Sequence, residues 1–283
     1  MQMPTTYGAE IEKPVLKIKG ESHKVSQKYF IKLAEQAKVR GTYLSLHKSD
    51  IKPDTVLGVV STDLGEQGLD NGFNLLESSI NYTHSLTSLH ERLMLDIKST
   101  QAALYSEEAS VINMAILPTA KRDFATYKDF VAPKGVYPYI WYRGWDHTAG
   151  IDGRAQNSPS TGVDPEEAAD AVSVIIGAGA AFIALFANSP YEEGKRSKFK
   201  ESRTQMWPRM MRHAKVSGDR TRAMFPPTRF RTMAEYFSWM FGRGTGIHFV
   251  LANQNQTAGH TDYKGIGERL LIIQGNPSLL TYL

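Results

Sequence analysis

The 283-residue sequence contains no cysteine. Disulfide bonds, thiolate catalysis and sulfur-ligated metal sites are therefore excluded, and any nucleophile or metal ligand must be an oxygen or nitrogen atom. Residues 1–10 lack the basic region, apolar run and small-residue cleavage pattern of a secretory signal, so we expect a cytoplasmic protein. Apolar residues make up 41% of the chain, which is enough for a substantial globular core.

Several common catalytic motifs are also absent. The sequence has no GxxxxGK[ST], no GxGxxG after a strand and no GxSxG, which argues against the usual nucleotide-binding loops and the hydrolase nucleophile elbow. Its eight histidines never form HxH or HExxH, which argues against a zinc hydrolase. Only His147, in WYRGWDHTAG, has unusual surroundings, and a loop histidine with local hydrogen bonds is the preferred interpretation.

Positive charge is concentrated in one segment. The net charge of the chain is +4, yet residues 195–231 contain twelve Lys or Arg and only Glu201 and Asp219 as acids. Such a segment could meet phosphate groups or nucleic acid, or could simply be a solvated surface. It lacks the interleaved aromatic residues of a single-strand binding platform, so nucleic acid is the least favoured partner.

The one candidate membrane segment is AVSVIIGAGAAFIALFA, residues 171–187, which carries no charge. It is barely long enough to span a bilayer and is rich in Ala and Gly, so we expect a buried core helix and no membrane contact. Asp164, Pro165, Glu166 and Glu167 precede it and form a strong helix start, with an N-cap, a first-turn proline and first-turn acids.

Short strands alternate with amphipathic helices elsewhere. The pattern predicts strands over 7–18, 42–46, 56–63, 72–80, 111–117 and 247–252, and helices over 26–39, 83–105 and 233–241. There is no regular βαβ rhythm, repeat or linker, so we expect a single α+β domain with an antiparallel sheet.

Alternation in YGAEIEK places Glu10 and Glu12 on one face of the first strand. Carboxylate oxygens suit Mg²⁺ or Mn²⁺, and Glu66, Asp70 and Glu77 could approach from neighbouring strands as further metal ligands. Taken alone, the ExE pattern is more often an exposed strand edge.

Residues 184–207, ALFANSPYEEGKRSKFKESRTQMW, carry a more specific signal. An ALFANSP segment followed by a Gly-Lys pair and an S-x-R-x-x-x-W cluster resembles the glutamate-cysteine ligase family, most closely its plant and proteobacterial branch. YGAEIEK, GFNLLESSI and FGRGTGIHFVLA resemble further family strings in the same order. The resemblance extends over nearly the whole chain.

The resemblance implies a curved, mainly antiparallel sheet with helices packed on its outer face. It also implies a cytoplasmic ligase of the glutathione-biosynthesis type, in which ATP phosphorylates the γ-carboxylate of glutamate and an amine, cysteine in the family, displaces phosphate. Glu10 and Glu12 match the metal-binding pair and Arg203 matches the substrate-anchoring arginine. Lys195, Lys198, Arg203 and Trp207 are the expected contacts to substrate or ATP.

The sequence departs from the family pattern in three places. Asn74 occupies the position of a family acid, so a carboxylate is lost unless Asp70 or Glu77 replaces it. QNSPSTGV, residues 156–163, stands in place of a Q-V-N-type strand, and its chemistry is unassigned. Family members continue past the point where this chain ends, so residues 1–283 are expected to form a ligase-like domain that is C-terminally incomplete relative to the family.

Two other functions therefore stay open beside the ligase. One is a non-catalytic relative that binds an amino acid or nucleotide or forms part of a larger assembly. The other is nucleic-acid binding through the basic segment, which predicts affinity that falls steeply with salt. Expected partners are small molecules, namely ATP, glutamate and an amine, with a homodimer or a C-terminal partner chain left open.

Overall fold

The computed structural model describes residues 5–149, 153–215, 217–222, 226 and 229–241. They form two compact units. The first comprises the chain up to Pro133 together with His147–Gly162 and Ala187–Met206, and the second comprises Lys134–Asp146, Val163–Phe186 and the chain from Trp207. The single-domain organisation stays a prediction. The strand expected over 247–252 lies outside the described residues.

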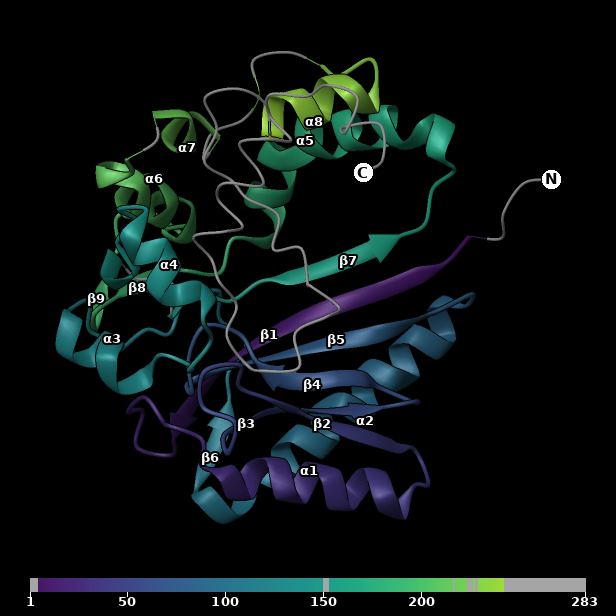
Figure 1. The fold of residues 1–283 in the computed structure, drawn as a ribbon, viewed down its shortest axis with the longest axis vertical. Coiled ribbons are helices and arrows are strands. Elements are labelled where there is room, and N and C mark those ends of the chain that lie inside the picture. The colour runs from purple at the N-terminus through teal and green to yellow at the C-terminus, as the bar shows by residue number, and fades with distance from the viewer. Residues whose placement is uncertain (1–4, 150–152, 216, 223–225, 227–228, 242–283) are drawn as a thin grey trace. The chain divides into compact units, whose positions relative to one another are not determined.

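The first unit is built on an antiparallel sheet in the order β2-β3-β4-β5-β1-β6, with β7 also paired to β1 (Figure 1). Its strands are β1 (Tyr7–Lys17), β2 (Tyr43–Lys48), β3 (Val56–Ser61), β4 (Gly65–Leu69), β5 (Leu75–Thr83), β6 (Ala109–Val111) and β7 (Asn157–Thr161). β1 is an interior strand, because β5 pairs with one of its edges while β7 pairs with its first half and β6 with its last residues along the other. The predicted α+β class with a mainly antiparallel sheet is confirmed.

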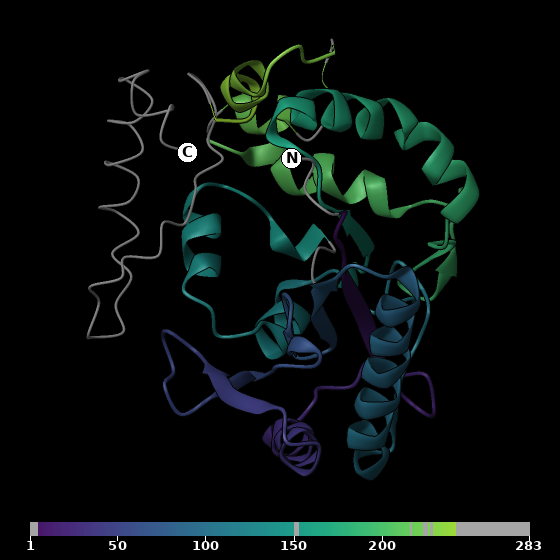
Figure 2. The same cartoon turned by 90° about the vertical axis from the view of Figure 1, so that its right-hand side faces the viewer.

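Two helices cover one face of this sheet. α1 (Gln27–Val39) begins at Ser26, whose side chain accepts a hydrogen bond from the Lys28 backbone amide and caps the helix. α2 (Leu86–Leu104) begins in the same way after Ser85. α1 contacts β3, and α2 contacts β5 and β1, as Figures 1 and 2 show. The apolar stripes predicted from the sequence therefore face the sheet, as expected for amphipathic helices.

Some elements differ from the sequence-based expectation. β4 was not predicted, because Gly65 and Gly68 dilute its apolar pattern. A strand was expected over 111–117, but β6 ends at Val111 and only an isolated bridge joins Ile116 to Arg154. The unassigned QNSPSTGV segment forms β7, whose exposed Ser and Thr residues give no apolar alternation. The unit also contains α3 (Phe124–Phe130) and a two-stranded hairpin, β8 (Tyr191–Glu192) and β9 (Lys195–Arg196).

The second unit is helical in its described part. It contains α4 (Val136–Tyr142), α5 (Ala168–Phe186), most of α6 (Met206–Met210), α7 (Ser217–Arg222) and α8 (Met233–Phe241). A short 3₁₀ turn at Pro165–Glu167 leads into α5, which confirms the predicted helix start at Asp164. Ser173 Oγ ties α5 to the segment before α8, because it accepts from the Phe230 amide at 3.1 Å and donates to the Phe230 carbonyl.

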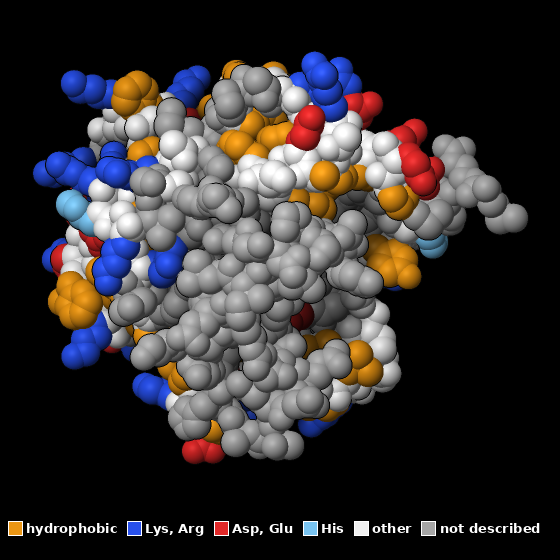
Figure 3. All heavy atoms as spheres, turned by 45° about the horizontal axis from the view of Figure 1, so that its top comes forward, with side chains coloured by type: hydrophobic (Ala, Val, Ile, Leu, Met, Phe, Trp, Pro, Cys, Tyr) orange, Lys and Arg blue, Asp and Glu red, His pale blue; other side chains and the backbone are white. Residues whose placement is uncertain are grey.

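The expectation that α5 is a buried core helix is wrong for the described structure. Ala169 is its only buried residue, and the exposed side chains include Val174, Ile175, Leu185 and Phe186. Apolar side chains are visible at the surface in Figure 3. By length and composition, Pro165–Phe186 is the one described helix that could cross a membrane. A single such helix is weak evidence for a span, and the absence of membrane contact stays an expectation.

Candidate functional site

The candidate site lies on the sheet face opposite α1 and α2. In β1, Ala9, Lys13 and Val15 are buried toward the helices, whereas Glu10 and Glu12 alternate with them and point the other way. This confirms the predicted shared orientation of Glu10 and Glu12. We call this side of the sheet the acidic face, defined by Glu10, Glu12, Glu66 and Glu77.

Strand pairing brings the other glutamates onto the same face. Glu12 lies opposite Glu77 of β5, and Glu10 lies opposite Ser79. Ser79 in turn lies opposite Glu66 of β4. Directly opposed residues of an antiparallel pair have Cβ atoms about 4.5–5.5 Å apart, so Glu12 and Glu77 are close neighbours of like charge.

Glu12 is a perturbed carboxyl of this face. Burial, then the nearby Asp70 and, more weakly, Glu77 raise its pKa from 4.5, and the resulting pKa is about 8. Arg154 and Arg203 oppose these effects. Two further acids, Asp70 and Glu77, and two guanidinium groups, of Arg154 and Arg203, therefore act on Glu12.

Gln156 joins Glu12 to Arg203. Its backbone amide donates to Glu12 Oε2 at 2.9 Å, and its carbonyl accepts from the Glu12 amide at 2.9 Å. Its side-chain Oε1 accepts a hydrogen bond from the Arg203 guanidinium. The backbone position of β1 and the orientation of the arginine thus depend on the same residue at the start of β7.

The segments ANSP and ESR hold Arg203 in place. Ser189 Oγ accepts from the Ser202 amide at 2.8 Å and the Arg203 amide at 3.2 Å, and donates to Glu201 Oε2 at 2.9 Å. Burial lowers the pKa of Arg203, whereas the negative charges of Glu12, Glu201 and Asp70 act to raise it. Among the described residues, Arg203 Nε is buried without a hydrogen-bond partner. This buried N–H is therefore an unused hydrogen-bond donor of the site.

The remaining predicted metal ligands are placed differently. Glu66 of β4 reaches across β3 to His47 Nδ1 of β2. Its side chain lies over Gly58 and Gly68, and a Cβ atom added at either glycine would lie 3.0–3.4 Å from Glu66 Oε1. Glu10 is exposed near the hydroxyl-bearing residues Ser79 and Ser160. In the part of the chain that the structure describes, no three His, Asp or Glu side chains are grouped closely enough to hold one metal ion. The ligand set stays a prediction.

The predicted ATP contacts from the basic segment do not surround Glu12. Lys195 lies on the exposed β8-β9 hairpin, where its charge acts on Glu193, and Lys198 is exposed beyond it. Trp207 belongs to α6 in the second unit. Of the four contacts predicted for substrate or ATP, only Arg203 acts on the Glu12 carboxyl. The roles of the other three residues stay predictions.

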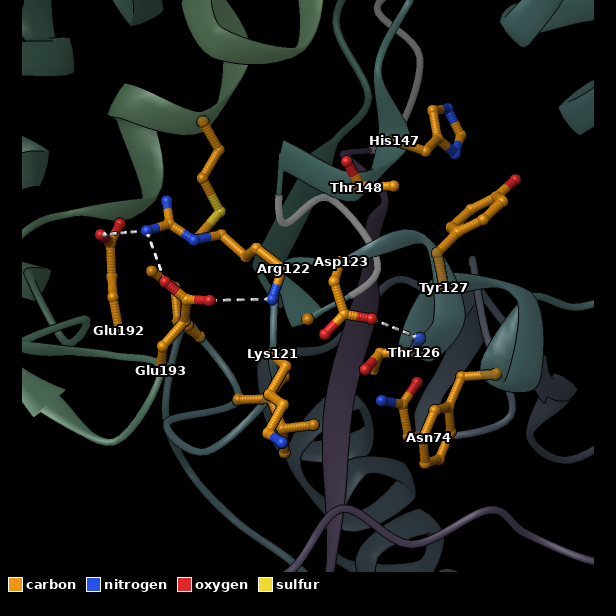
Figure 4. Close-up of a pocket in the computed structure, with 16 residues that line it drawn as sticks. Asn74, Lys121, Arg122, Asp123, Thr126, Tyr127, His147, Thr148, Glu192 and Glu193 are labelled. Atoms are coloured by element: carbon orange, nitrogen blue, oxygen red, sulfur yellow. Dashed lines mark hydrogen bonds and ion pairs between the residues drawn. The ribbon is translucent and has the colours of Figure 1, made fainter.

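Asn74 lies away from the acidic face. It is buried and lines a cavity with Tyr127 and His147, and its Oδ1 has no hydrogen-bond partner among the described residues (Figure 4). His147 is buried edge-on against Tyr127, with ring centroids 5.8 Å apart, which gives it a packing role. Asp70 and Glu77 supply acids near Glu12, and their replacement of the family acid absent at Asn74 stays a prediction.

Sequence reasoning missed Arg154 and Gln156. Both come from a loop and an irregular strand start with no periodic pattern, and a lone Arg or Gln carries no spacing signal. The polar run QNSPSTGV, which begins with Gln156 and stands in place of a family strand, was the one sign that this segment is unusual.

Comparison with known proteins addresses the basic segment directly. The family model for glutamate-cysteine ligase family 2 (GCS2) matches residues 159–263, which include the ALFANSP segment and Arg203. No curated protein matches the chain. The match and the mainly antiparallel α+β fold agree with the resemblance seen in the sequence. Residues 159–263 are therefore similar to the glutamate-cysteine ligase family.

Proposed function

We propose that this chain catalyses the ATP-dependent ligation of the γ-carboxylate of glutamate to an amine. The family implies carboxylate-amine ligase activity in general. The observation that supports the finer proposal is that Asp70, Glu77, Arg154 and Arg203 all act electrostatically on Glu12. A ligase must bind a polyphosphate and a carboxylate together, and such a site needs both acids for cations and guanidinium groups for anions.

The proposed reaction has two steps. A γ-carboxylate oxygen of glutamate attacks the terminal phosphorus of ATP, which forms an acyl phosphate and releases ADP. The amine nitrogen then attacks the acyl carbon, a C–N bond forms, and phosphate leaves as the amine loses a proton. In this scheme Arg203, with Nε free of hydrogen bonds among the described residues, anchors a substrate carboxylate in a fixed orientation.

The acids of the site have the oxygen chemistry that Mg²⁺ or Mn²⁺ prefers. The repulsion from Asp70 and Glu77, which helps to raise the pKa of Glu12, is an interaction that a bound dication would relieve. Because no three of these acids are grouped closely enough in the described structure to hold an ion by themselves, we propose that Glu12, Asp70 and Glu77 would hold the cation together with phosphate oxygens of the nucleotide, with Glu10 and Glu66 beside them. When bound, Mg²⁺ would neutralise phosphate charge during transfer.

The test is calorimetric titration of the full chain with ATP and Mg²⁺, with and without glutamate. Glu12→Gln should weaken metal-dependent binding at least tenfold, and Arg203→Met should weaken glutamate binding in the presence of nucleotide. The matched controls are Glu91→Gln, at an exposed residue of α2, and Arg212→Met, at an exposed residue of the second unit. A folded protein that binds no nucleotide at millimolar concentration would favour the non-catalytic alternative.

A further inference from the structure

A buried polar network lies directly beneath the acidic face. Asp96 of α2 is fully buried, and its Oδ2 contacts Lys13 Nζ of β1 at 2.5 Å. Its Oδ1 accepts from Ser78 Oγ of β5 at 2.7 Å and from Gln67 Nε2 of β4 at 2.8 Å. One helix carboxylate is therefore held by three adjacent strands.

Each strand residue of this network directly follows a glutamate of the acidic face. The pairs are Glu12–Lys13, Glu66–Gln67 and Glu77–Ser78. Successive side chains of a strand point to opposite faces, so each glutamate points away from Asp96 only while its strand keeps its register. A slip of one residue in one direction would place a glutamate beside the buried Asp96 in all three strands.

Such a slip would be strongly unfavourable. It would bring two carboxylates together in a buried site, where each disfavours the ionised form of the other. It would also remove Lys13 from Asp96 and leave the buried carboxylate without its cation. Lys13 is further fixed by Ser78 Oγ, which accepts its hydrogen bond at 2.6 Å. The arrangement thus penalises the register errors that would hide the acids of the site.

We propose that Asp96, through Lys13, Ser78 and Gln67, is a positioning residue that fixes the strand register and so keeps Glu12, Glu66 and Glu77 on one face. Buried ion pairs contribute little net stability, and their best-attested use is to select one register over another. None of these four residues touches the proposed substrates. Their effect on ligand binding rests on the proposed function, whereas their effect on register does not.

The absence of native cysteine allows disulfide trapping to report the register. Glu10 and Ser79 are directly opposed, so the pair Glu10→Cys/Ser79→Cys should close in the native register. If β1 slips so that Glu12 takes the place of Lys13, Ala9 comes opposite Ser79, and Ala9→Cys/Ser79→Cys reports the slip. In the native sheet Ala9 and Ser79 point to opposite faces, so the slip trap stays open.

The traps are compared in the native network and in Lys13→Gln/Asp96→Asn, which keeps the polar shapes and removes both charges. We expect the slip trap to close at least tenfold more in the neutral pair. Arg40→Gln/Asp63→Asn, which neutralises a 2.7 Å ion pair elsewhere in the unit, should leave both traps unchanged. If the first variant does not fold, Lys13→Met/Asp96→Leu takes its place. A slip trap that stays open in a folded, neutral network would overturn the proposal.

Titration with ATP and Mg²⁺ separates this inference from the proposed function. The neutral network should bind nucleotide at least fivefold more weakly than the native network, while the Arg40/Asp63 control should match the native protein. A native protein that binds no nucleotide would contradict the proposed function, and the traps alone would then decide the register proposal. Unchanged nucleotide affinity in a variant that does slip would show that register does not govern the site.

Discussion

Glu12 and Glu77 face each other across β1 and β5, two carboxylates in directly opposed positions of an antiparallel pair. Like charges in such positions are destabilising unless a proton or a cation intervenes. The pKa of Glu12 is raised chiefly by burial, then by Asp70, and least by the opposed Glu77. The predictions on Glu12 below follow from it.

Replacing Asp70 with Asn should lower the pKa of Glu12 from about 8 toward the ordinary glutamate value of 4.5, because Asp70 is the largest electrostatic cause of the shift after burial. Glu77→Gln should lower it less. Carboxyl-carbon NMR titration measures both changes. Asp54→Asn, at an exposed loop position, serves as the control and should leave the pKa of Glu12 unchanged. An unshifted Glu12 in Asp70→Asn would mean that burial alone sets this pKa.

Divalent cation binding should strengthen as the pH rises toward about 8. A cation competes with the proton on Glu12, so affinity grows as this carboxyl ionises and levels off above its pKa of about 8. Titration with Mn²⁺ over this range measures the slope, and Glu12→Gln should reduce it. A pH-independent affinity in the native protein would argue against Glu12 as a ligand.

The same carboxyl should make the ligand-free protein less stable as the pH rises. The folded-state pKa of about 8 lies above the ordinary value of 4.5, so the folded state binds more protons between these limits. Its contribution to the free energy of unfolding is therefore full below pH 4.5 and declines as the pH rises to about 8. Urea unfolding of native protein and Glu12→Gln should show a smaller decline in the variant. Equal declines would assign the pH dependence to other groups.

Gly65→Ala should destabilise the first unit more than Gly20→Ala. Both glycines have positive φ angles, +80° and +86°, which cost a non-glycine residue about 1–2 kcal/mol. A Cβ at Gly65 would also lie 2.2 Å from the Ser79 carbonyl oxygen, whereas nothing lies within 4 Å at Gly20. Thermal unfolding measures the difference, which should reach a further ~1–3 kcal/mol. Similar losses for the two variants would contradict the close approach of β4 to β5.

Much of the first unit could be predicted from the sequence because its signals are local. Alternation in YGAEIEK defined β1 and the shared face of Glu10 and Glu12, and the apolar spacing after Ser26 defined α1. β4 and β7 were not predicted, because glycine or hydroxyl-bearing residues occupy positions at which apolar residues would indicate a strand. Their strand geometry comes from pairing with β5 and β1, which is a tertiary effect.

The candidate site was predictable only in part for a related reason. The alternating glutamates and the ALFANSP segment mark Glu12 and Arg203 separately. The residues between them, Arg154 and Gln156, act through backbone and side-chain contacts that no local pattern encodes. The exposure of α5 was also mispredicted, because an apolar composition indicates a helix that avoids water without showing what covers it.

The pairing of β1 with strands on both of its edges has a consequence for the order of folding. This strand is synthesised first, yet its partners on one edge, β6 and β7, are completed only with Val111 and Thr161. Contacts so distant in sequence close slowly, because the intervening chain must be ordered before they form. Gln156 is made just before β7 and Arg203 later still, so a chain emerging from the ribosome carries Glu12 without these partners until residue 203 has been added. The charged site is thus completed only after the helix-covered strands β1 to β5 have been synthesised.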